Sequence, residues 1–296
     1  MTARIIDGKR VAAEIRAELK DEVGKLKKRG IVPGLGVILV GDDPASKSYV
    51  TSKERSCAEM GIYSDDNRLP GETPQGELMA LVERMNEDPR IHGILVQLPL
   101  PRHLNESEVL LAIDPNKDVD GFHPINVGKM VVGEKAFLPC TPHGVVQLLV
   151  RSGVTIDGAH VVIVGRSNIV GKPLANMLIQ KSPTGNATVT VCHTRTKDLA
   201  SYTRQADILI AAAGRPNTIT ADMVRDGVVV IDVGVNRVED ATKKQGYRLV
   251  GDVDFEAVKE KASLITPVPG GVGPMTITML LYNTVASAKR AAGLDG

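Results

Sequence analysis

The sequence is poor in the features that mark several classes of protein. It has three cysteines, Cys57, Cys140 and Cys192, and none of them forms a C-x-x-C pair, which argues against a disulfide framework and against a zinc site. No segment approaches the roughly 20 consecutive apolar residues that a membrane span needs. Lysine plus arginine (36) and aspartate plus glutamate (35) nearly cancel, so no broad positive field exists to hold a nucleic acid. The composition favours a cytoplasmic protein with neither a membrane nor a nucleic acid as partner.

The N-terminal segment, MTARIIDGKRVAAEIRAELK, lacks the pattern of a targeting sequence. It carries acidic residues and no uninterrupted apolar stretch, which excludes a typical signal peptide and a typical transit peptide. Apolar residues instead recur at helical spacing, at Val11, Ile15, Leu19, Val23 and Leu26. The spacing predicts an amphipathic first helix.

The chain is long enough for two domains, and its pattern of apolar runs suggests two. It has 296 residues, of which 43% are apolar and 24% charged, as in soluble globular proteins. In the first half, LGVILVG (35–41) and IHGILVQLPL (91–100) alternate with helices expected from about residue 46 and near 106–113. A stretch rich in Pro, Gly and Asn, residues 114–142, then interrupts this rhythm. We expect a loop-rich domain boundary there.

A second series of apolar runs follows this stretch. Runs this continuously apolar are typical of a parallel sheet that is covered on both faces. We therefore predict an α/β fold: residues 1–140 form a catalytic domain, on which a C-terminal helix (275–296) packs, and residues 141–274 form a Rossmann-like domain. The expected strands of the second domain are HVVIVG (160–165), ATVTVC (187–192), DILIAAA (207–213), VVVIDVG (228–234) and SLITPV (263–268).

A candidate nucleotide site lies at the first strand of the second domain. VVIVGRSNIVGKP (161–173) has the order strand, tight turn, helix start, in which backbone N–H groups and the helix dipole receive a phosphate. Gly165 supplies the turn. Ser167 stands where the G-x-G-x-x-G fingerprint has its second glycine, and Gly171 falls one residue late. The alternative is an ordinary strand-to-helix turn.

The end of the next strand indicates which nucleotide would bind. Folds that bind NAD usually place an Asp or Glu there for the ribose 2′-hydroxyl, whereas this strand ends in CHTR (192–195). Arg166 and Ser167, opposite Thr194 and Arg195, would form a cationic, hydroxyl-rich pocket for a 2′-phosphate. This favours NADP over NAD. Alternatively, the two arginines are solvated loop residues.

Three polar residues of the first domain are candidates for chemistry. Tyr49 and Lys53 are four residues apart on a predicted helix, so an aromatic platform would lie beside an amine. A lysine can act as acid or base if its pKa is lowered, although such pairs also occur as plain surface residues. Gln97 ends an apolar strand, where α/β folds place ligands. Its amide needs a hydrogen-bond partner, either the backbone or a ligand ring.

The segment DPNKDVDGFHPINVG resembles a calcium loop only at first sight. Asn116, Asp118 and Asp120 alternate ahead of Gly121, but position 12 of the loop would be Val127 instead of the bidentate Glu. A carboxylate here could instead grip the N–H groups of a pterin, or it could cap the loop. No metal is expected.

Taken together, these segments resemble the tetrahydrofolate dehydrogenase/cyclohydrolase family along nearly the whole chain. The segment that ends in QLPL and the one that reads PGGVGPMT are long and specific. The resemblance rests on S-Y-V-x-x-K (48–53), GILVQLPLP (93–101), KDVDGFHPINVG (117–128), PCTPHG (139–144), VVIVGRSNIVGKP (161–173), VIDVGVNR (230–237) and TPVPGGVGPMT (266–276).

The resemblance implies a homodimer that forms through the cofactor domain, with an active-site cleft between the two domains. It implies NADP-dependent oxidation of 5,10-methylenetetrahydrofolate and hydrolysis of the methenyl product to 10-formyltetrahydrofolate. Lys53 would be the central catalytic residue, Tyr49 would orient the folate, Gln97 would support the lysine and Asp120 would bind the pterin. The folate would contact Tyr49, Lys53, Val96, Gln97, Leu98, Asp120, Pro269, Gly270, Gly271, Val272 and Gly273, and the nucleotide would contact Gly165, Arg166, Ser167, Thr194 and Val235.

Other functions stay open on the sequence. The same scaffold could serve as a dehydrogenase alone or prefer NAD, and Lys53 argues against loss of the hydrolytic step. A non-catalytic NADP-binding protein would not need Tyr49, Lys53, Gln97 and Asp120 together. An amino-acid dehydrogenase of similar plan should show a basic motif that grips its substrate, and the sequence contains none that we recognise.

Overall fold

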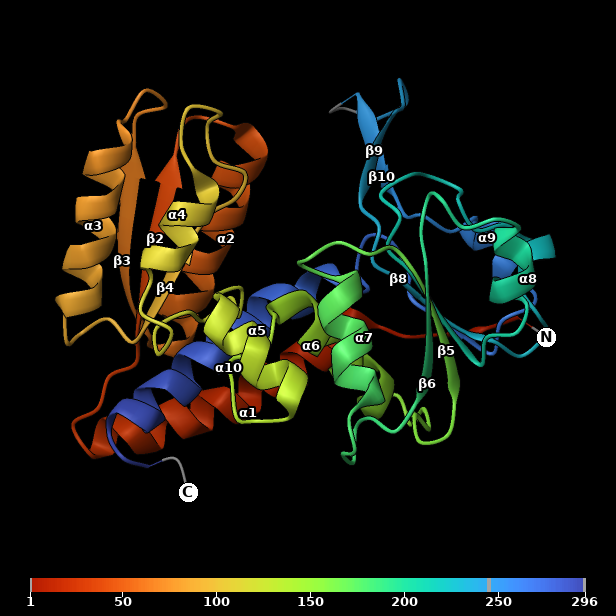
Figure 1. Ribbon diagram of the computed structural model, residues 1–296, viewed down its shortest axis with the longest axis horizontal. Helices are drawn as coiled ribbons and strands as arrows, with labels where there is room; N and C mark the ends of the chain where they lie inside the picture. Colours follow the sequence, from red (N-terminus) through yellow and green to blue (C-terminus); the bar gives the residue numbers. More distant parts are fainter. Residues whose placement is uncertain (1, 244–245, 295–296) are drawn as a thin grey trace. The chain divides into compact units, whose positions relative to one another are not determined.

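The computed structural model describes residues 2–243 and 246–294, whose contacts divide the chain into two compact units (Figure 1). One, the three-stranded unit, comprises Glu14–Cys140 and the C-terminal stretch from Ile277. The other, the six-stranded unit, comprises the chain up to Ala13 and Thr141–Thr276. The predicted α/β class is confirmed in both.

The three-stranded unit is built on a parallel sheet. β2 (Gly34–Val40) is central and pairs with β3 (Tyr63–Leu69) on one side and with β4 (Gly93–Val96) on the other. Every residue of β2 is buried, as the apolar run predicts for a strand covered on both faces. β3 has the polar sequence YSDDNRL, which carries no strand signal, and it forms because it lies at the sheet edge beside β2.

Helices cover both faces of this sheet. α2 (Pro44–Met60) contacts β2 and β3, whereas α3 (Gln75–Glu87) and α4 (Glu106–Ala112) share an apolar core with β2 and β4. α2 begins where the Asp43 carboxylate accepts a hydrogen bond from the Ser46 N–H at 2.7 Å. This cap sets the helical register that carries Tyr49 and Lys53.

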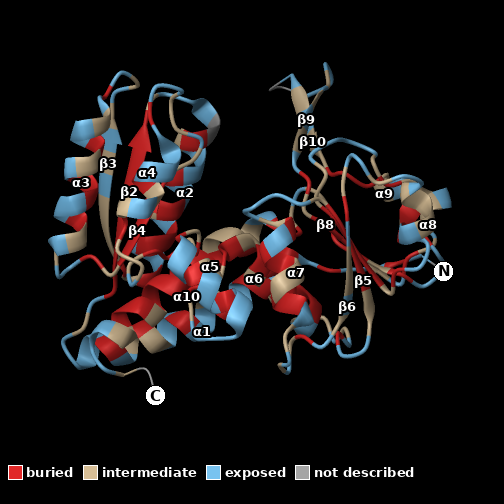
Figure 2. Ribbon diagram, viewed as in Figure 1, coloured by how far each residue is buried: buried red, intermediate tan, exposed pale blue. Residues whose placement is uncertain are grey.

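Three further helices lie wholly or partly in this unit. α1 (Gly8–Lys28) is the predicted amphipathic helix, and its periodic apolar residues are buried (Figure 2). α5 (Pro124–Val132) lies inside the stretch that we expected to be loop, so that expectation is wrong. It forms because proline suits the first helical turn and His123 Nδ1 accepts from the Ile125 N–H at 3.1 Å. α10 (Gly273–Ala291) is the predicted C-terminal helix, and from Ile277 on it belongs to this unit.

The six-stranded unit contains one parallel sheet in the order β1-β11-β8-β7-β5-β6. β1 pairs with β11, so the segment up to Ala13 belongs to this unit and not to the first domain, where we had placed it. A strand as short as β1 gives no periodic signal, and only the pairing places it. The strands are β1 (Arg4–Ile5), β5 (His160–Val164), β6 (Thr188–Cys192), β7 (Ile208–Ala211), β8 (Val229–Asp232) and β11 (Leu264–Ile265).

The core of this sheet is red in Figure 2, where β5, β7 and β8 are largely buried. α7 contacts β5 and β6, and an antiparallel hairpin follows β8. Across the described ranges, no helix is long and apolar enough to cross a membrane. The remaining elements are α6 (Cys140–Arg151), α7 (Gly171–Ile179), α8 (Leu199–Thr203), a 3-10 helix (Ala221–Met223), β9 (Asn236–Glu239), β10 (Tyr247–Val250) and α9 (Phe255–Val258).

Candidate active site

Lys53 and Gln97 meet at the carboxyl end of the three-stranded sheet. Lys53 comes from α2 and is 8% exposed, and Gln97 directly follows β4. The Lys53 ammonium donates to Gln97 Oε1 at 2.9 Å, and Gln97 Nε2 donates to the Leu98 carbonyl at 2.7 Å. Gln97 therefore finds both a side-chain and a backbone partner. Burial lowers the pKa of Lys53, and the nearby Asp120 opposes this shift.

Asp120 and Cys140 join Lys53 in the same unit. Burial raises the pKa of Asp120 to about 6, while the Lys53 cation and a hydrogen bond from the Cys140 thiol act in the opposite direction. Burial and the Asp120 charge hold the pKa of Cys140 well above its usual range, so this thiol stays protonated. The site therefore combines an amine and a carboxylate that interact electrostatically, next to a thiol that is not a reactive thiolate.

The two carboxylates of the 118–120 turn have different tasks. Asp118 is 2% exposed and accepts hydrogen bonds from the backbone N–H groups of Gly121, Phe122 and His123 and from Asn126 Nδ2, at 2.9–3.2 Å. It is therefore the loop cap. Asp120 interacts electrostatically with Lys53 and is not used in this cap. Of the two roles left open by the sequence, loop capping belongs to Asp118, and ligand binding by Asp120 stays a prediction.

Asn283 of α10 anchors the two segments that carry Asp120 and Cys140, a feature that the sequence analysis missed. Its amide donates to the Val119 carbonyl at 2.8 Å and to the Leu138 carbonyl at 3.0 Å. Asn283 is 3% exposed. A lone amide in an apolar helix was the only available signal, and it does not reveal which loops the helix meets.

We expect Asn283→Leu to lower the free energy of unfolding by about 2 kcal/mol, because the Leu138 carbonyl loses this donor and the Val119 carbonyl keeps only the Cys140 thiol, at 3.3 Å. Asn176→Leu is a matched control, since the Asn176 amide donates to a carbonyl of its own helix, Lys172, in an exposed hydrogen bond. Urea titration would compare the variants. Equal stability of Asn283→Leu and wild type would show that the carbonyls do not depend on this amide.

The remaining residues predicted to contact the folate differ in their exposure and in the unit to which they belong. Tyr49 lies one helical turn before Lys53 and is 50% exposed, so its ring is available to a ligand. Val96 is 2% exposed and belongs to the apolar core, so only its backbone could meet a folate. Pro269–Gly273 lies in the six-stranded unit, where the Gly271 carbonyl would be only 1.8 Å from a Cβ at Gly8. The expected cleft between the domains stays a prediction.

The predicted nucleotide turn is a close-packed glycine cradle. Gly165, directly after β5, has φ 144°, and a Cβ there would lie 2.1 Å from the Ala212 carbonyl oxygen. Gly171 opens α7, and its Cβ would lie 2.1 Å from the Gly165 carbonyl oxygen. Ser167 Oγ accepts from the Val170 N–H at 3.1 Å. Gly171 therefore lets the start of α7 pack closely against the turn at Gly165, although its spacing differs from the standard fingerprint by one residue.

The proposed 2′-phosphate residues come from neighbouring strand ends. β5 and β6 pair up to Val164 and Cys192, so the turns that follow them share one sheet edge. Arg166, Thr194 and Arg195 are all exposed there. The turn after β6 is closed by its own contacts, including Arg195 N–H to His193 Nδ1 at 3.1 Å. The segment 192–195 contains no carboxylate.

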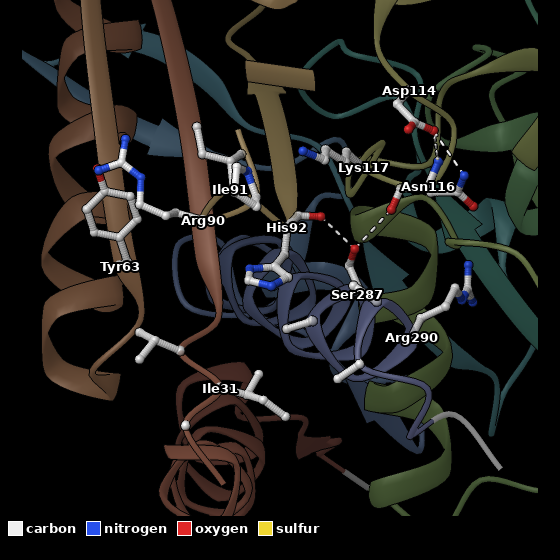
Figure 3. A pocket seen from close by; sticks show the side chains of 16 residues that line it. Ile31, Tyr63, Arg90, Ile91, His92, Asp114, Asn116, Lys117, Ser287 and Arg290 are labelled. Atoms are coloured by element: carbon white, nitrogen blue, oxygen red, sulfur yellow. Dashed lines mark hydrogen bonds between the residues drawn. The ribbon is translucent and has the colours of Figure 1, made fainter. Parts of the chain in front are cut away.

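A separate cavity of about 980 Å³ lies at the opposite end of the three-stranded sheet (Figure 3). Tyr63 and His92, at the amino ends of β3 and β4, line it, whereas ligands of α/β sheets bind at the carboxyl ends. Its polar groups hold loops together: Ser287 donates to the carbonyls of His92 and Asn116. It is therefore not the site of Lys53. No cluster of His, Cys, Asp or Glu in the described ranges could hold a metal.

Comparison with known proteins identifies two family domains. Residues 6–120 match the catalytic domain of tetrahydrofolate dehydrogenase/cyclohydrolase, and residues 139–292 match its NAD(P)-binding domain. The bifunctional protein FolD of Syntrophus aciditrophicus is 62% identical over 294 residues, which cover 99% of this chain and all of the relative. The FolD of Moorella thermoacetica is 59% identical, over 98% of this chain and all of the relative.

Solved structures agree. The bifunctional FolD enzyme of Campylobacter jejuni has a TM-score of 0.92 at 53% identity and covers 97% of this chain and 99% of its own. The Trypanosoma brucei enzyme, solved with NADP cofactor and an inhibitor, has a TM-score of 0.93 at 42% identity, over 99% of both chains. The predicted family and the predicted nicotinamide nucleotide-binding domain are confirmed. This chain belongs to the tetrahydrofolate dehydrogenase/cyclohydrolase family.

Proposed function

We propose that this protein oxidises 5,10-methylenetetrahydrofolate with NADP and hydrolyses the methenyl product to 10-formyltetrahydrofolate. The observation that carries the proposal is the buried contact between Lys53 and Gln97 beside Asp120. A buried lysine with a lowered pKa, next to a carboxylate, suits proton transfer near neutral pH. The three-stranded unit would form the folate domain and the six-stranded unit the nucleotide domain.

The residues of the six-stranded unit fit NADP. Gly165 has no room for a Cβ, and α7 begins a few residues later, as a phosphate site at a helix start requires. Arg166, Ser167, Thr194 and Arg195 would hold the 2′-phosphate, and Val235, which is 50% exposed, would contact the nicotinamide half. When bound, the nicotinamide ring accepts the hydride.

For the first reaction, the protein has mainly to orient the folate. Loss of hydride from the methylene carbon leaves a methenyl cation that the two flanking nitrogens stabilise, so the step needs little acid or base help. Tyr49 would stack on the flat ring system, and Asp120 would accept hydrogen bonds from pterin N–H groups. Positioning of this kind can supply a large part of a rate enhancement.

The second reaction requires a proton to move. Water adds to the methenyl carbon, one proton leaves, and opening of the ring gives the 10-formyl product. Lys53 in its amine form would accept the proton of the attacking water, and Gln97 would hold the amine in place through its 2.9 Å contact. A cationic substrate beside the lysine would further favour the neutral amine.

The pKa of Asp120 predicts an acid limit for hydrolysis. Because burial raises that pKa to about 6, the carboxyl group is ionised above pH 6 and neutral below it. The charge needed for pterin binding is therefore lost as pH falls, and kcat/KM for hydrolysis should drop below about pH 6. Protonation of Lys53 acts in the same direction. The pH profile of Asp120→Asn should be lower, and its acid limb should shift to lower pH, because only Lys53 then titrates and its pKa loses the raising effect of the Asp120 charge.

Asp66→Asn is the control for this profile. The pKa of Asp66 is also raised, to about 7, first by burial and then by the neighbouring Glu54. Asp66 lies on the edge strand β3, outside the proposed site, so its variant should keep the wild-type limb. An unchanged limb in Asp120→Asn would assign it to another group.

The proposed function is tested by absorbance. Purified protein is mixed with 5,10-methylenetetrahydrofolate and either NADP or NAD. The absorbance of the reduced nucleotide and that of the methenyl species are followed together. NADPH formation without lasting methenyl accumulation is expected. Persistent methenyl species would identify a dehydrogenase alone, and nucleotide binding without turnover would identify a binding protein.

We also propose a cytoplasmic homodimer that associates through the nucleotide domain. β6 is an edge strand, and Val191 on it and Ile179 at the end of α7 are 39% and 55% exposed. Apolar side chains beside an open strand edge favour association. Light scattering after size exclusion should give twice the mass of the 31.6 kDa chain, whereas a monomer at micromolar concentration would contradict the proposal.

A further inference from the structure

The six-stranded unit contains two buried aspartates, Asp232 at the end of β8 and Asp252 shortly after β10. They are 3% and 0% exposed, and neither belongs to the residues assigned so far. The Asp232 carboxylate accepts from the backbone N–H groups of Gly234, Asp252 and Val253 at 2.9–3.0 Å. It thus fixes the segment that carries Asp252 against the end of β8.

Asp252 then connects two loops of the nucleotide edge. Its Oδ2 accepts from the backbone N–H groups of Ala213 at 2.6 Å and Gly214 at 2.8 Å, after β7. Its Oδ1 accepts from Asn236 Nδ2 at 2.9 Å, after β8. Each carboxylate oxygen of Asp252 therefore holds a different loop, and every donor named here is a neutral group.

Two glycines pack so closely against these carboxylates that neither position has room for a side chain. A Cβ at Gly234 would lie 2.2 Å from Asp252 Oδ1, and a Cβ at Gly251 would lie 1.8 Å from Asp232 Oδ2. The network also reaches the glycine turn, because Gly165 packs against Ala212, the residue before the first loop held by Asp252. Closely packed and hydrogen-bonded segments therefore connect Gly165, through Ala213, to Gly234 and Asn236 on either side of Val235.

We propose that Asp252 is a positioning residue for the dehydrogenase reaction, which fixes the backbone between Gly165 and Val235 on which the nicotinamide half of NADP rests. The inference rests on the proposed nucleotide contacts of Gly165 and Val235. Asp252 lies outside the three-stranded unit and holds no residue of the Lys53 group. It should therefore affect hydride transfer and leave the hydrolytic reaction nearly unchanged, which a general structural role would not do.

A reciprocal exchange between Asp252 and Asn236 tests this inference. In Asp252→Asn, the amide oxygen can still accept from the N–H groups of Ala213 and Gly214. The new amide nitrogen then faces Asn236 Nδ2, so that two donors meet and no hydrogen bond forms between them. Asn236→Asp in the same chain supplies an acceptor at that point and restores the hydrogen bond with its direction reversed. We expect the single variant to lose about tenfold in kcat/KM for NADP, which corresponds to about 1.4 kcal/mol, and the double variant to recover most of it.

Hydrolysis of 5,10-methenyltetrahydrofolate is measured on the same variants without nucleotide. Its rate should stay within about twofold of wild type, because this assay needs none of the nucleotide contacts. Asp222→Asn is the matched control, because the Asp222 carboxylate is exposed and accepts from the Thr220 hydroxyl. If Asp252→Asn does not fold, Asn236→Ala removes the 2.9 Å contact to Oδ1, together with a longer hydrogen bond to the Val250 carbonyl at 3.5 Å, and should still raise the KM for NADP without slowing hydrolysis.

Three results would overturn the inference: unchanged dehydrogenase kinetics in Asp252→Asn, equal losses in both activities, or a folded double variant no better than the single one. If Asp252→Asn does not fold, unchanged KM for NADP in Asn236→Ala would overturn it as well. Failure of the proposed function is separate, because wild-type protein would then form no NADPH at all.

Discussion

Lys53→Met should lower the rate of methenyltetrahydrofolate hydrolysis by a factor on the order of 10² to 10⁴, the range expected when a general acid or base is removed. Methionine has nearly the length of the lysine stem and carries no charge. It should fit the buried position without leaving an unpaired cation, although Gln97 Oε1 loses its donor. The dissociation constant for NADP should stay within about twofold, because Lys53 lies in a different unit from the nucleotide turn.

The matched control is Lys47→Met, on the same helix. Lys47 pairs with the exposed Asp42 and has a side chain that is 44% exposed, so its removal tests for a general effect of lost charge. Stopped-flow decay of methenyl absorbance gives the rate, and titration with NADPH fluorescence gives the binding constant. Full hydrolysis by Lys53→Met would reject the catalytic assignment.

Arg166→Gln should weaken NADP binding by roughly 10- to 100-fold, as expected for one charge-assisted hydrogen bond worth about 1.5–3 kcal/mol. Binding of NAD should change by less than about threefold, because NAD lacks the 2′-phosphate that the guanidinium would contact. The ratio of the two dissociation constants is therefore the quantity of interest. Arg195→Gln should move it in the same direction.

Arg4→Gln is the control for these variants. Arg4 lies on β1 in the same unit, and its guanidinium donates to the Ser152 carbonyl at 2.8 Å. Arg4→Gln removes one positive charge, as Arg166→Gln does, but it leaves the turns after β5 and β6 unchanged. Isothermal titration with both nucleotides gives the constants. Parallel losses for NADP and NAD in Arg166→Gln would contradict a 2′-phosphate pocket.

The local pattern of the chain determined much of the fold. The periodic residues of α1 and the apolar runs of β2, β5, β7 and β8 were predicted, because burial on both faces demands uninterrupted apolar strands. Seven sequence segments together, above all the one that ends in QLPL and the one that reads PGGVGPMT, also predicted the family, because long motifs in fixed order carry their own specificity.

Tertiary contacts decided the rest. β3 is polar and exists only as the partner of β2, and β1 joins the second sheet by pairing with β11, which lies near the other end of the sequence. α5 depends on a proline and a histidine cap within a segment whose composition resembles a loop. In each case a pairing partner or a helix cap outweighs the local propensity. The periodicity of apolar residues does not reveal such a partner or cap.

The same division holds at the site. Lys53 was a candidate from its helical spacing to Tyr49, and Gln97 from its place at the end of an apolar strand. The loop pattern alone did not separate Asp120 from Asp118, and only the family resemblance favoured Asp120. The folded loop shows that Asp118 directs its oxygens to backbone N–H groups. Nor could the sequence reveal that Asn283 and Asp252 hold loops distant in sequence, because a hydrogen bond depends on where the chain returns in space.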